Sequence, residues 1–210
     1  MTPVSSRFFR AALVSAAGFA LIGAASAAPI NLIENGSFES VSQKAGTWNI
    51  YSSLAGWQVG GKGVEIRDNV AGTAYDGKNF VELDTTKNSW ISQAFETTIG
   101  QSYKVSFFYS PRQGVASNSN DILALLNGTV AKTASGSGIG KSGNVWQEID
   151  FNFVATGPMS TLGFMAAGVS DSYGGSLDKV SVSAVPEPSS WATLLAGLLG
   201  LGVITRRRTR

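Results

Sequence analysis

The alternation of apolar and polar residues is the feature that most constrains what this chain of 210 residues can fold into. From Tyr103 to Tyr109 every second residue is apolar, and the same period runs through residues 145–154. Successive side chains of a β-strand point to opposite faces of its sheet, so a period of two predicts a strand with one buried face. Both segments are therefore expected to cover a hydrophobic core.

Shorter segments of the same kind recur along the chain at intervals of about 8–15 residues, as is typical of antiparallel β-proteins. Asn127-Gly128 predicts a hairpin, and residues 111–120 and 134–144 are expected as loops, the second a flexible one because Gly and Ser dominate it. No segment has a convincing amphipathic helical pattern, so the expected fold is all-β, an antiparallel jelly-roll β-sandwich. The expected strands are 31–38, 47–51, 56–59, 64–67, 80–84, 89–96, 103–109, 122–126, 130–133, 145–154, 159–167 and 177–184.

The N-terminal end has the pattern of a secretory signal peptide. Arg7 and Arg10 form a basic region, residues 11–24 are apolar and uncharged, and Ala25-Ser26-Ala27 offers small residues for cleavage. We therefore expect a signal helix over residues 1–27 that is removed on export, with a retained anchor helix as the alternative.

The C-terminal end combines three features in a fixed order. Pro186-Glu187-Pro188 ends the preceding strand, because proline donates no hydrogen bond to a sheet. An apolar stretch over residues 189–205 reaches 17 residues, the lower limit of the roughly 17–25 that span a bilayer. The basic cluster Arg206-Arg207-Arg208 is expected to stay on the cytoplasmic side. A buried core helix is the alternative for the apolar stretch.

This ordered trio resembles the PEP-CTERM sorting signal of Gram-negative bacteria, over Val185 to Arg210. The resemblance implies that the secretion machinery and an exosortase act on the chain, and that the exosortase cleaves near the motif. It also implies transient anchoring in the inner membrane through residues 189–205, followed by delivery to the cell surface or the extracellular matrix. The expected division is a signal peptide (1–27), a β-sandwich domain (28–185) and a sorting signal (186–210).

Composition excludes several kinds of site in the central domain. The two ends contain six of the 16 basic residues and one of the 14 acidic residues, which leaves the domain with a net charge of −3. That charge gives no support for nucleic-acid binding. The chain has no cysteine and no histidine, so disulfides, Ser-His-Asp triads and histidine-based zinc sites are excluded.

Three short motifs in the central domain resemble the galactose-binding-like jelly rolls. They are the opening Asn35-Gly36-Ser37-Phe38-Glu39, Gly56-Trp57 about twenty residues later, and the closing Asp178-Lys179-Val180-Ser181-Val182. That group includes many carbohydrate-binding modules and a plant cell-wall family of unknown function. The resemblance implies a jelly roll that binds carbohydrate, with exopolysaccharide as the expected partner.

The carboxylate of Asp178 is expected to be buried and therefore to need a partner. It has the same phase as Val180 and Val182 in the last strand, which places its carboxylate on the buried side, where a charge requires a partner or an ion. In several carbohydrate-binding modules of this fold, a Glu after the first strand and an Asp in the last strand bind structural calcium. The resemblance implies Glu39 and Asp178 as the matching calcium ligands. The alternatives are pairing of Asp178 with Lys179 or an N–H group, or an exposed strand end.

Exposed aromatic rings with a few polar groups are the usual sugar-binding elements of such modules. Trp90 is out of phase with Ile91 and Phe95, which predicts an outward ring, and Tyr109 and Arg112 close the most regular strand. Packing in the core or at its rim is the alternative for each ring. The ligand-binding candidates are Trp48, Tyr51, Tyr75, Trp90, Tyr109, Arg112 and Tyr173.

Paired carboxylates suggest a second chemistry, since Glu82 and Asp84 share one strand face and such pairs can hydrolyse glycosides. Solvated carboxylates are much commoner in an exported, loop-rich domain, so no catalytic residue is assigned and the chain is expected not to be an enzyme. The expected function is a non-catalytic surface or matrix protein that associates with exopolysaccharide. The alternatives are a structural or adhesive matrix protein without a specific glycan pocket, and a polysaccharide-modifying hydrolase.

Overall fold

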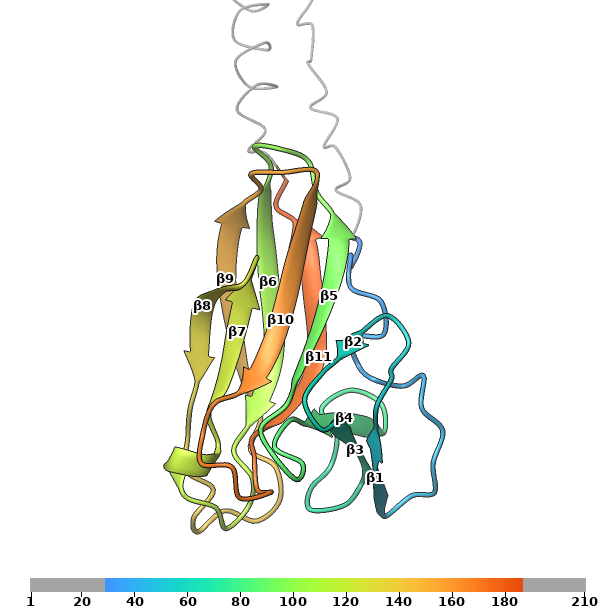
Figure 1. Cartoon of the computed structure of the whole chain (residues 1–210), viewed down its shortest axis with the longest axis vertical. Helices are drawn as coiled ribbons and strands as arrows, with labels where there is room; N and C mark the ends of the chain where they lie inside the picture. The colour runs from blue at the N-terminus through green and yellow to red at the C-terminus, as the bar shows by residue number, and fades with distance from the viewer. Residues whose placement is uncertain (1–28, 187–210) are drawn as a thin grey trace, which may run out of the picture.

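The computed structural model describes residues 29–186, which form two antiparallel β-sheets packed face to face (Figure 1). Within these residues one sheet has six strands in the order β1-β3-β4-β11-β6-β9, and the other has five in the order β2-β5-β10-β7-β8. Neighbouring strands pair antiparallel, which confirms the predicted antiparallel β-sandwich. The strands are β1 (Thr47–Tyr51), β2 (Gln58–Val59), β3 (Val64–Asp68), β4 (Asn79–Glu82), β5 (Trp90–Glu96), β6 (Ser102–Ser110), β7 (Ile122–Leu126), β8 (Thr129–Ala134), β9 (Gln147–Val154), β10 (Met159–Ala166) and β11 (Ser176–Ala184).

The core lies between the two sheets and receives the apolar face of β6, as the alternation predicts. The side chains of Tyr103, Val105, Phe107 and Tyr109 are all buried. Phe107 meets Phe164 of the opposite sheet edge-to-face, with ring centroids 5.0 Å apart, a favourable geometry for aromatic pairs. Burial of this apolar surface is the main force that holds the sheets together.

The hairpin predicted at Asn127-Gly128 joins β7 to β8. The two strands pair antiparallel around it, and Asn127 and Gly128 have φ angles of 49° and 80°. Positive φ at both central residues is what a tight hairpin with the right-handed twist of its strands requires, so the prediction is confirmed.

Residues 31–38, expected as the first strand, form turns and not a strand. Asn35 and Phe38 both have positive φ, 52° and 61°, which strand residues do not adopt. Gly36 lies so close to the carbonyl of Val180 that any side chain there would clash, and Phe38 enters the core, where it is fully buried. The strand prediction was wrong because the turn preference of Asn-Gly outweighs the short apolar pattern before it.

Strand β11 contains a bulge that changes which face of the sheet Asp178 occupies. The pairing with β6 shifts register just after Asp178, and Lys179 adopts a φ of 46°. Asp178 pairs with Phe108, out of phase with the core side chains of β6, whereas Val182 after the bulge lies in the core. The prediction that Asp178 shares the phase of Val182 was therefore wrong, because an extra residue interrupts the period of two. Its carboxylate is nevertheless fully buried.

Several long loops gather at one end of the sandwich, below the sheets in Figure 1. The loop over 111–120 contains a short 3-10 helix, η1 (Ser117–Ser119), where none was expected. Gly138 makes two backbone hydrogen bonds of 2.9 Å to this loop, one of them from the N–H of Gly114. The loop over 134–144 is thus joined to 111–120, and the two form one surface, which we call the loop end.

The predicted signal helix (1–27) and most of the predicted sorting signal lie outside the described residues. This holds for Glu187, Pro188, the apolar stretch 189–205 and the basic cluster Arg206-Arg207-Arg208, all of which stay predictions. Between residues 29 and 186, no helix has the length and apolar character needed to cross a membrane.

Candidate functional site

An open pocket of about 720 Å³ lies at the loop end of the sandwich. Its walls come from segments far apart in the sequence: the loop after β6, the η1 turn and the segment before β11. The volume falls within the range of about 300–1,000 Å³ that is usual for small-molecule sites. Its polar and aromatic lining residues are Arg112, Gln113, Asn118, Ser119, Asp171 and Tyr173.

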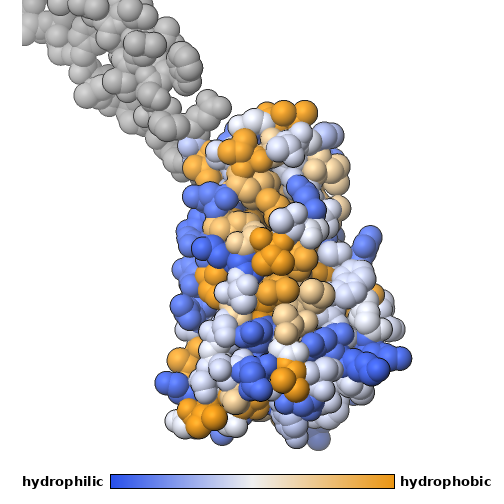
Figure 2. Space-filling model, turned by 60° about the vertical axis from the view of Figure 1, so that its left-hand side comes forward, coloured by the Kyte–Doolittle hydropathy of each residue, from blue (hydrophilic) through white to orange (hydrophobic). Residues whose placement is uncertain are grey.

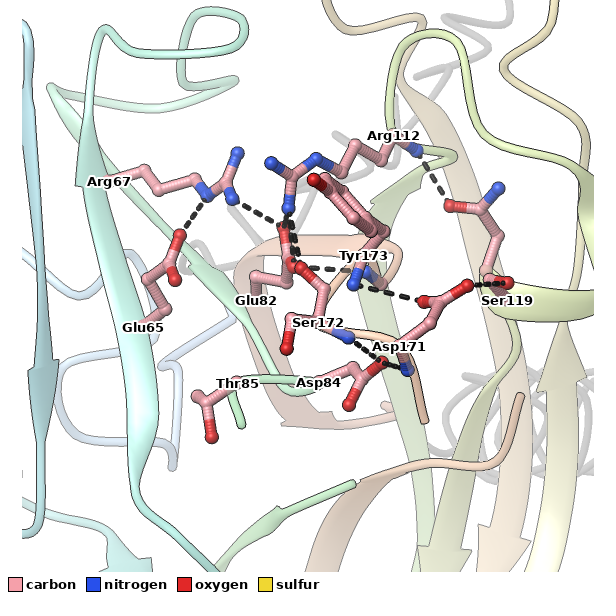
Figure 3. Close-up of polar contacts among 12 residues, drawn as sticks. Glu65, Arg67, Glu82, Asp84, Thr85, Arg112, Ser119, Asp171, Ser172 and Tyr173 are labelled. Atoms are coloured by element: carbon pink, nitrogen blue, oxygen red, sulfur yellow. Dashed lines mark hydrogen bonds and ion pairs between the residues drawn. The ribbon is translucent and has the colours of Figure 1, made fainter. Parts of the chain in front are cut away.

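Two of the predicted ligand residues, Arg112 and Tyr173, meet in this pocket (Figure 3). The guanidinium carbon of Arg112 lies 4.4 Å from the centroid of the Tyr173 ring. Such a cation–π contact orients the ring, while Tyr173 stays 50% exposed to solvent. The loop-end pocket therefore presents an oriented aromatic surface beside a guanidinium group.

Glu82, at the end of β4, holds the guanidinium of Arg112 in place. Nη1 of Arg112 donates to both carboxylate oxygens of Glu82, at 2.8 and 3.0 Å, and to the carbonyl of Ser172 at 3.1 Å. Glu82 itself is fully buried. Charge-assisted hydrogen bonds of this kind are stronger than neutral ones, so the position of Arg112 in the pocket depends on Glu82.

A second arginine, the buried Arg67, extends this network into the sheet (Figure 3). Nη2 of Arg67 lies 2.9 Å from the carboxylate of Glu82, and its Nε lies 2.6 Å from Oε1 of Glu65 on the same strand. Burial raises the pKa of Glu82 to about 7, while the positive charges of Arg67 and Arg112 act in the opposite direction. Buried charges destabilise a fold unless they are paired, so each member of the network depends on the others.

Asp84, two residues after Glu82, holds the loop that precedes β11. Its Oδ2 accepts the N–H groups of Asp171 and Ser172 at 2.9 and 3.0 Å, and Oε1 of Glu82 accepts the N–H of Gly174 at 2.9 Å. Both carboxylates are buried and bonded to the loop backbone. The pair considered for glycoside hydrolysis therefore organises the wall of the pocket from beneath and does not line it.

Asp171 and Ser119 line the pocket and were missed by the sequence reasoning. The hydroxyl of Ser119 donates to Oδ2 of Asp171 at 2.8 Å, and the N–H of Tyr173 donates to Oδ1 at 3.1 Å. Asp171 stands two residues before the candidate Tyr173 in a polar loop, which is a signal that could have found it. Nothing in the sequence connects Ser119 with that loop, because 52 residues separate the two side chains.

Tyr109, another predicted ligand residue, lies beneath the loops and not in the pocket. Its side chain is buried, and its hydroxyl donates to the carbonyl of Asn120 at 3.1 Å. Burial raises the pKa of its phenol above the ordinary value. This is the core-packing alternative raised for each ring, because Tyr109 is an inward position of β6 whose hydroxyl supports the loop above it.

The remaining aromatic candidates lie elsewhere on the domain. Trp48 is exposed and Tyr51 half-buried on β1, which is an edge strand. Tyr75 stacks on Phe108, with ring centroids 3.5 Å apart. Trp90 points outward on β5, as predicted, from the five-stranded sheet. None of these four candidates lines the loop-end pocket.

Glu39 and Asp178, expected as calcium ligands, accept hydrogen bonds from the loop before β4. Oδ2 of Asp178 accepts the N–H groups of Tyr75 and Asp76 at 2.7 and 2.9 Å, and Oε1 of Glu39 accepts those of residues 78 and 79 at 2.8 and 2.7 Å. This is the N–H alternative raised for Asp178. Among residues 29–186 no three Asp, Glu, His or Cys side chains converge as a metal site, so backbone carbonyls would have to supply most of the six to eight oxygens that calcium prefers. Calcium binding stays a prediction, which melting with and without a chelator tests.

Comparison with known proteins finds one matching family. The profile of a family described as "Protein of unknown function (DUF642)" matches residues 31–183. No curated protein matches the sequence.

Among solved structures the likeness is one of fold. The Stig cyclase Fisc from Fischerella sp. TAU, in complex with an indole compound, is 14% identical with a TM-score of 0.55, covering 77% of this chain and all of its own. An arabinose-bound GH51 α-L-arabinofuranosidase is 15% identical with a TM-score of 0.50, covering 73% of this chain. This chain spans 26% of that enzyme's length. At these identities the comparison shows a shared fold alone.

Proposed function

This chain belongs to the DUF642 family of proteins of unknown function, and we propose that its β-sandwich is a non-catalytic carbohydrate-binding jelly roll. The observation that carries the proposal is the contact of Arg112 with Tyr173 at the wall of an open pocket. The arginine orients the tyrosine ring, and the exposed part of the ring offers a surface on which the C–H face of a sugar can stack.

The polar groups around Tyr173 suit the hydroxyl groups of a sugar. Asp171 supplies carboxylate oxygens as acceptors, while the side-chain amides of Gln113 and Asn118 both donate and accept. The charge of Arg112 is balanced by Glu82, and the carboxylate of Asp171 lies exposed in the pocket. This balance favours a neutral sugar over an anionic one, because like charges repel at short range.

We favour a binding protein over a hydrolase because of the burial and the hydrogen-bond partners of Glu82 and Asp84. Glycoside hydrolysis needs two carboxyl groups that both reach the scissile bond. Here both are buried and engaged by arginine side chains or backbone N–H groups. Turnover of a host polysaccharide that disappears in Glu82→Gln or Asp84→Asn would contradict this part of the proposal.

The ends of the chain suggest where binding takes place. We propose that the signal peptide over residues 1–27 directs export and that the Pro186-Glu187-Pro188 signal is processed by an exosortase after transient anchoring in the inner membrane. The domain then reaches the cell surface or extracellular matrix, where exopolysaccharide is the partner. The support is the order of motif, apolar stretch and basic cluster in the sequence.

Affinity electrophoresis in gels that contain the exopolysaccharide tests the proposal, after a glycan array has selected the sugar. We expect the wild-type chain to be retarded and Tyr173→Ala to bind about five- to thirtyfold more weakly, since a lost stacking contact of about 1–2 kcal/mol has that effect. Trp48→Ala is the matched control, because Trp48 is as exposed as Tyr173 but lies outside the pocket. Equal loss in both variants, or no retardation by any glycan, would overturn the proposal.

A further inference from the structure

A second hollow lies on the outer face of the five-stranded sheet. Apolar side chains on the face drawn in Figure 2 gather in a stripe along the long axis of the domain, whereas the hollow is located by the residues that line it. The hollow has a volume of about 350 Å³ and shares no lining residue with the loop-end pocket. We call it the sheet trough. Its side-chain walls include Trp90, Ser92, Leu125, Thr161 and Met165.

Gly163 lines the sheet trough at the middle of β10. Neither the backbone conformation nor the space around this position requires a glycine. It pairs with Ser92 on one side and Leu125 on the other, without a register shift in either ladder. Its φ is not in the left-handed region, and a side chain there would make only ordinary contacts, 3.5 Å from the carbonyl oxygen of Ile91 and 3.9 Å from Cβ of Leu125. Glycine weakens a strand and often marks a place where a ligand approaches closely.

Trp90 forms a wall of the trough, and its ring is held by a second glycine. Any side chain at Gly60 would clash with the indole ring of Trp90, and the N–H of Gly60 donates to the carbonyl of Trp90 at 3.0 Å. The residue nevertheless stays 40% exposed. An aromatic face that is held in place before binding reduces the entropy lost when a ligand stacks on it.

The lining of the trough identifies the chemistry of its occupant. No charged side chain of the described residues lines it, so an ionic ligand would lose hydration without gaining a counter-charge. The hydroxyls of Ser92 and Thr161 lie on partly exposed residues, and a purely apolar ligand would cover them without offering hydrogen bonds. A neutral pyranose satisfies both conditions, because it has an apolar C–H face and a rim of hydroxyl groups.

We propose that the sheet trough is a second saccharide subsite, which takes the apolar face of one neutral pyranose ring against Trp90 in the space left by Gly163. This inference rests on the proposed function and deepens it, because a domain with two subsites binds a polysaccharide with higher avidity than either subsite alone. The hydroxyls of Ser92 and Thr161 pair with the rim of the sugar.

Fluorine NMR of the whole chain separates the two subsites. Labelling with 5-fluorotryptophan marks the five tryptophans, and 3-fluorotyrosine marks the five tyrosines, so Trp90 reports on the trough and Tyr173 on the loop-end pocket. Trp90→Phe and Tyr173→Phe assign the two signals. The probes are neutral tetrasaccharides of β-1,4-linked glucose, galactose and mannose. We expect at least one probe to shift the Trp90 signal saturably, and Gly163→Leu, which fills the trough, to weaken that response at least tenfold with the Tyr173 response unchanged.

The outcomes distinguish the trough from the loop-end pocket. A shift of the Tyr173 signal alone, or a Trp90 shift that persists unchanged in Gly163→Leu, overturns the trough subsite. A shift of the Trp90 signal alone overturns the loop-end site, and no shift of either overturns both. Thr161→Leu, at a partly exposed position that lines the trough, replaces Gly163→Leu if that variant does not fold, and it keeps the Trp90 signal. Met159→Ala is the matched control, because Met159 is exposed on the same strand outside the trough, and it is expected to leave both responses unchanged.

Discussion

Two loops of this domain are held in the same way, yet only one of them supplies residues, Asp171 and Tyr173, to the lining of the loop-end pocket. In the loop before β4, four backbone N–H groups of residues 75–79 donate to Glu39 and Asp178. In the loop before β11, N–H groups of residues 171–174 donate to Asp84 and Glu82. Loop backbone that is buried must find partners outside the sheets, and in both places carboxylates from neighbouring segments supply them.

The two loops differ in whether the carboxylate that holds them also binds arginine side chains. Glu82 binds Arg67 and Arg112 in addition to the loop backbone, so the same carboxylate shapes the wall and positions a cation in the pocket. Asp178 is bonded by backbone N–H groups only, and the adjacent Lys179 lies 5.2 Å from the ring of Tyr75. In the loop before β11, Arg112 thus connects the buried carboxylate of Glu82 to the wall of the pocket.

Among the substitutions that test this difference between the loops, removal of Glu82 is expected to have the largest effect on the free energy of unfolding. Glu82→Ala leaves Arg67 and Arg112 without their shared counter-charge, which is expected to lower the free energy of unfolding by about 3–5 kcal/mol. Urea denaturation measures the change. The control is Asp150→Ala, because Asp150 pairs with Lys104 at 2.6 Å in a solvent-exposed contact, whose removal is expected to change stability far less. Equal losses in both variants would contradict a structural role for the buried network.

Each loop has one aspartate that accepts its backbone N–H groups, and removal of these two aspartates in turn tests whether the loops differ in binding. Asp84→Ala and Asp178→Ala each leave two loop N–H groups without their acceptor, which is expected to cost about 1–3 kcal/mol of unfolding free energy. Retardation in exopolysaccharide gels is expected to be lost in Asp84→Ala, because that loop carries Tyr173, and to persist in Asp178→Ala. The comparison fails if the two variants lose binding equally.

The pH dependence of stability gives the smallest expected effect. Burial raises the pKa of Asp178 to about 7, against the hydrogen bonds from the N–H groups of Asp76, Lys179 and Tyr75. A carboxyl whose pKa is higher in the folded state than in the unfolded chain stabilises the fold at low pH, and this contribution is lost as the pH rises through about 7.

Asp178→Asn stays uncharged over this range and removes that contribution. Between pH 6 and pH 8 its unfolding free energy is therefore expected to fall less than that of the wild type, by on the order of 1–2 kcal/mol. Thermal melting across the pH range measures the difference. Asp150→Asn is the control, since its contact with Lys104 lowers the pKa of Asp150 and its contribution changes only at lower pH. A wild-type slope retained in Asp178→Asn would show that another group causes it.

Most of the strands were predictable because their signal is local. Strands β1 and β7 begin and end at the predicted residues, 47–51 and 122–126, and β6 buries the predicted face. The two errors, the strand over 31–38 and the phase of Asp178, have one cause. In each, a residue with positive φ, Asn35 or Lys179, interrupts the strand conformation. The alternation of apolar and polar residues gives no sign of such an interruption.

The candidate site was predictable only in part, because its contacts are long-range. Arg112 and Tyr173 were candidates for their chemistry, but so were five other residues that the fold distributes elsewhere or buries. Thirty residues separate Arg112 from Glu82, and no local pattern reports that the two side chains meet. The sheet trough likewise depends on Gly163 and Trp90, which only the pairing of β10 with β5 brings together.

The sequence by itself determined that this domain is an antiparallel β-sandwich without disulfides, because the side-chain period and the composition are properties of the linear chain. It also contains the ordered motifs at both ends on which the proposal of export rests. Two properties follow from tertiary contacts alone: which exposed aromatic rings line a hollow, and which carboxylates are buried and accept hydrogen bonds from a loop. Those roles depend on strand pairing and loop closure between distant residues, where the free energy of burying a charge or a ring is set by neighbours that the linear order does not show.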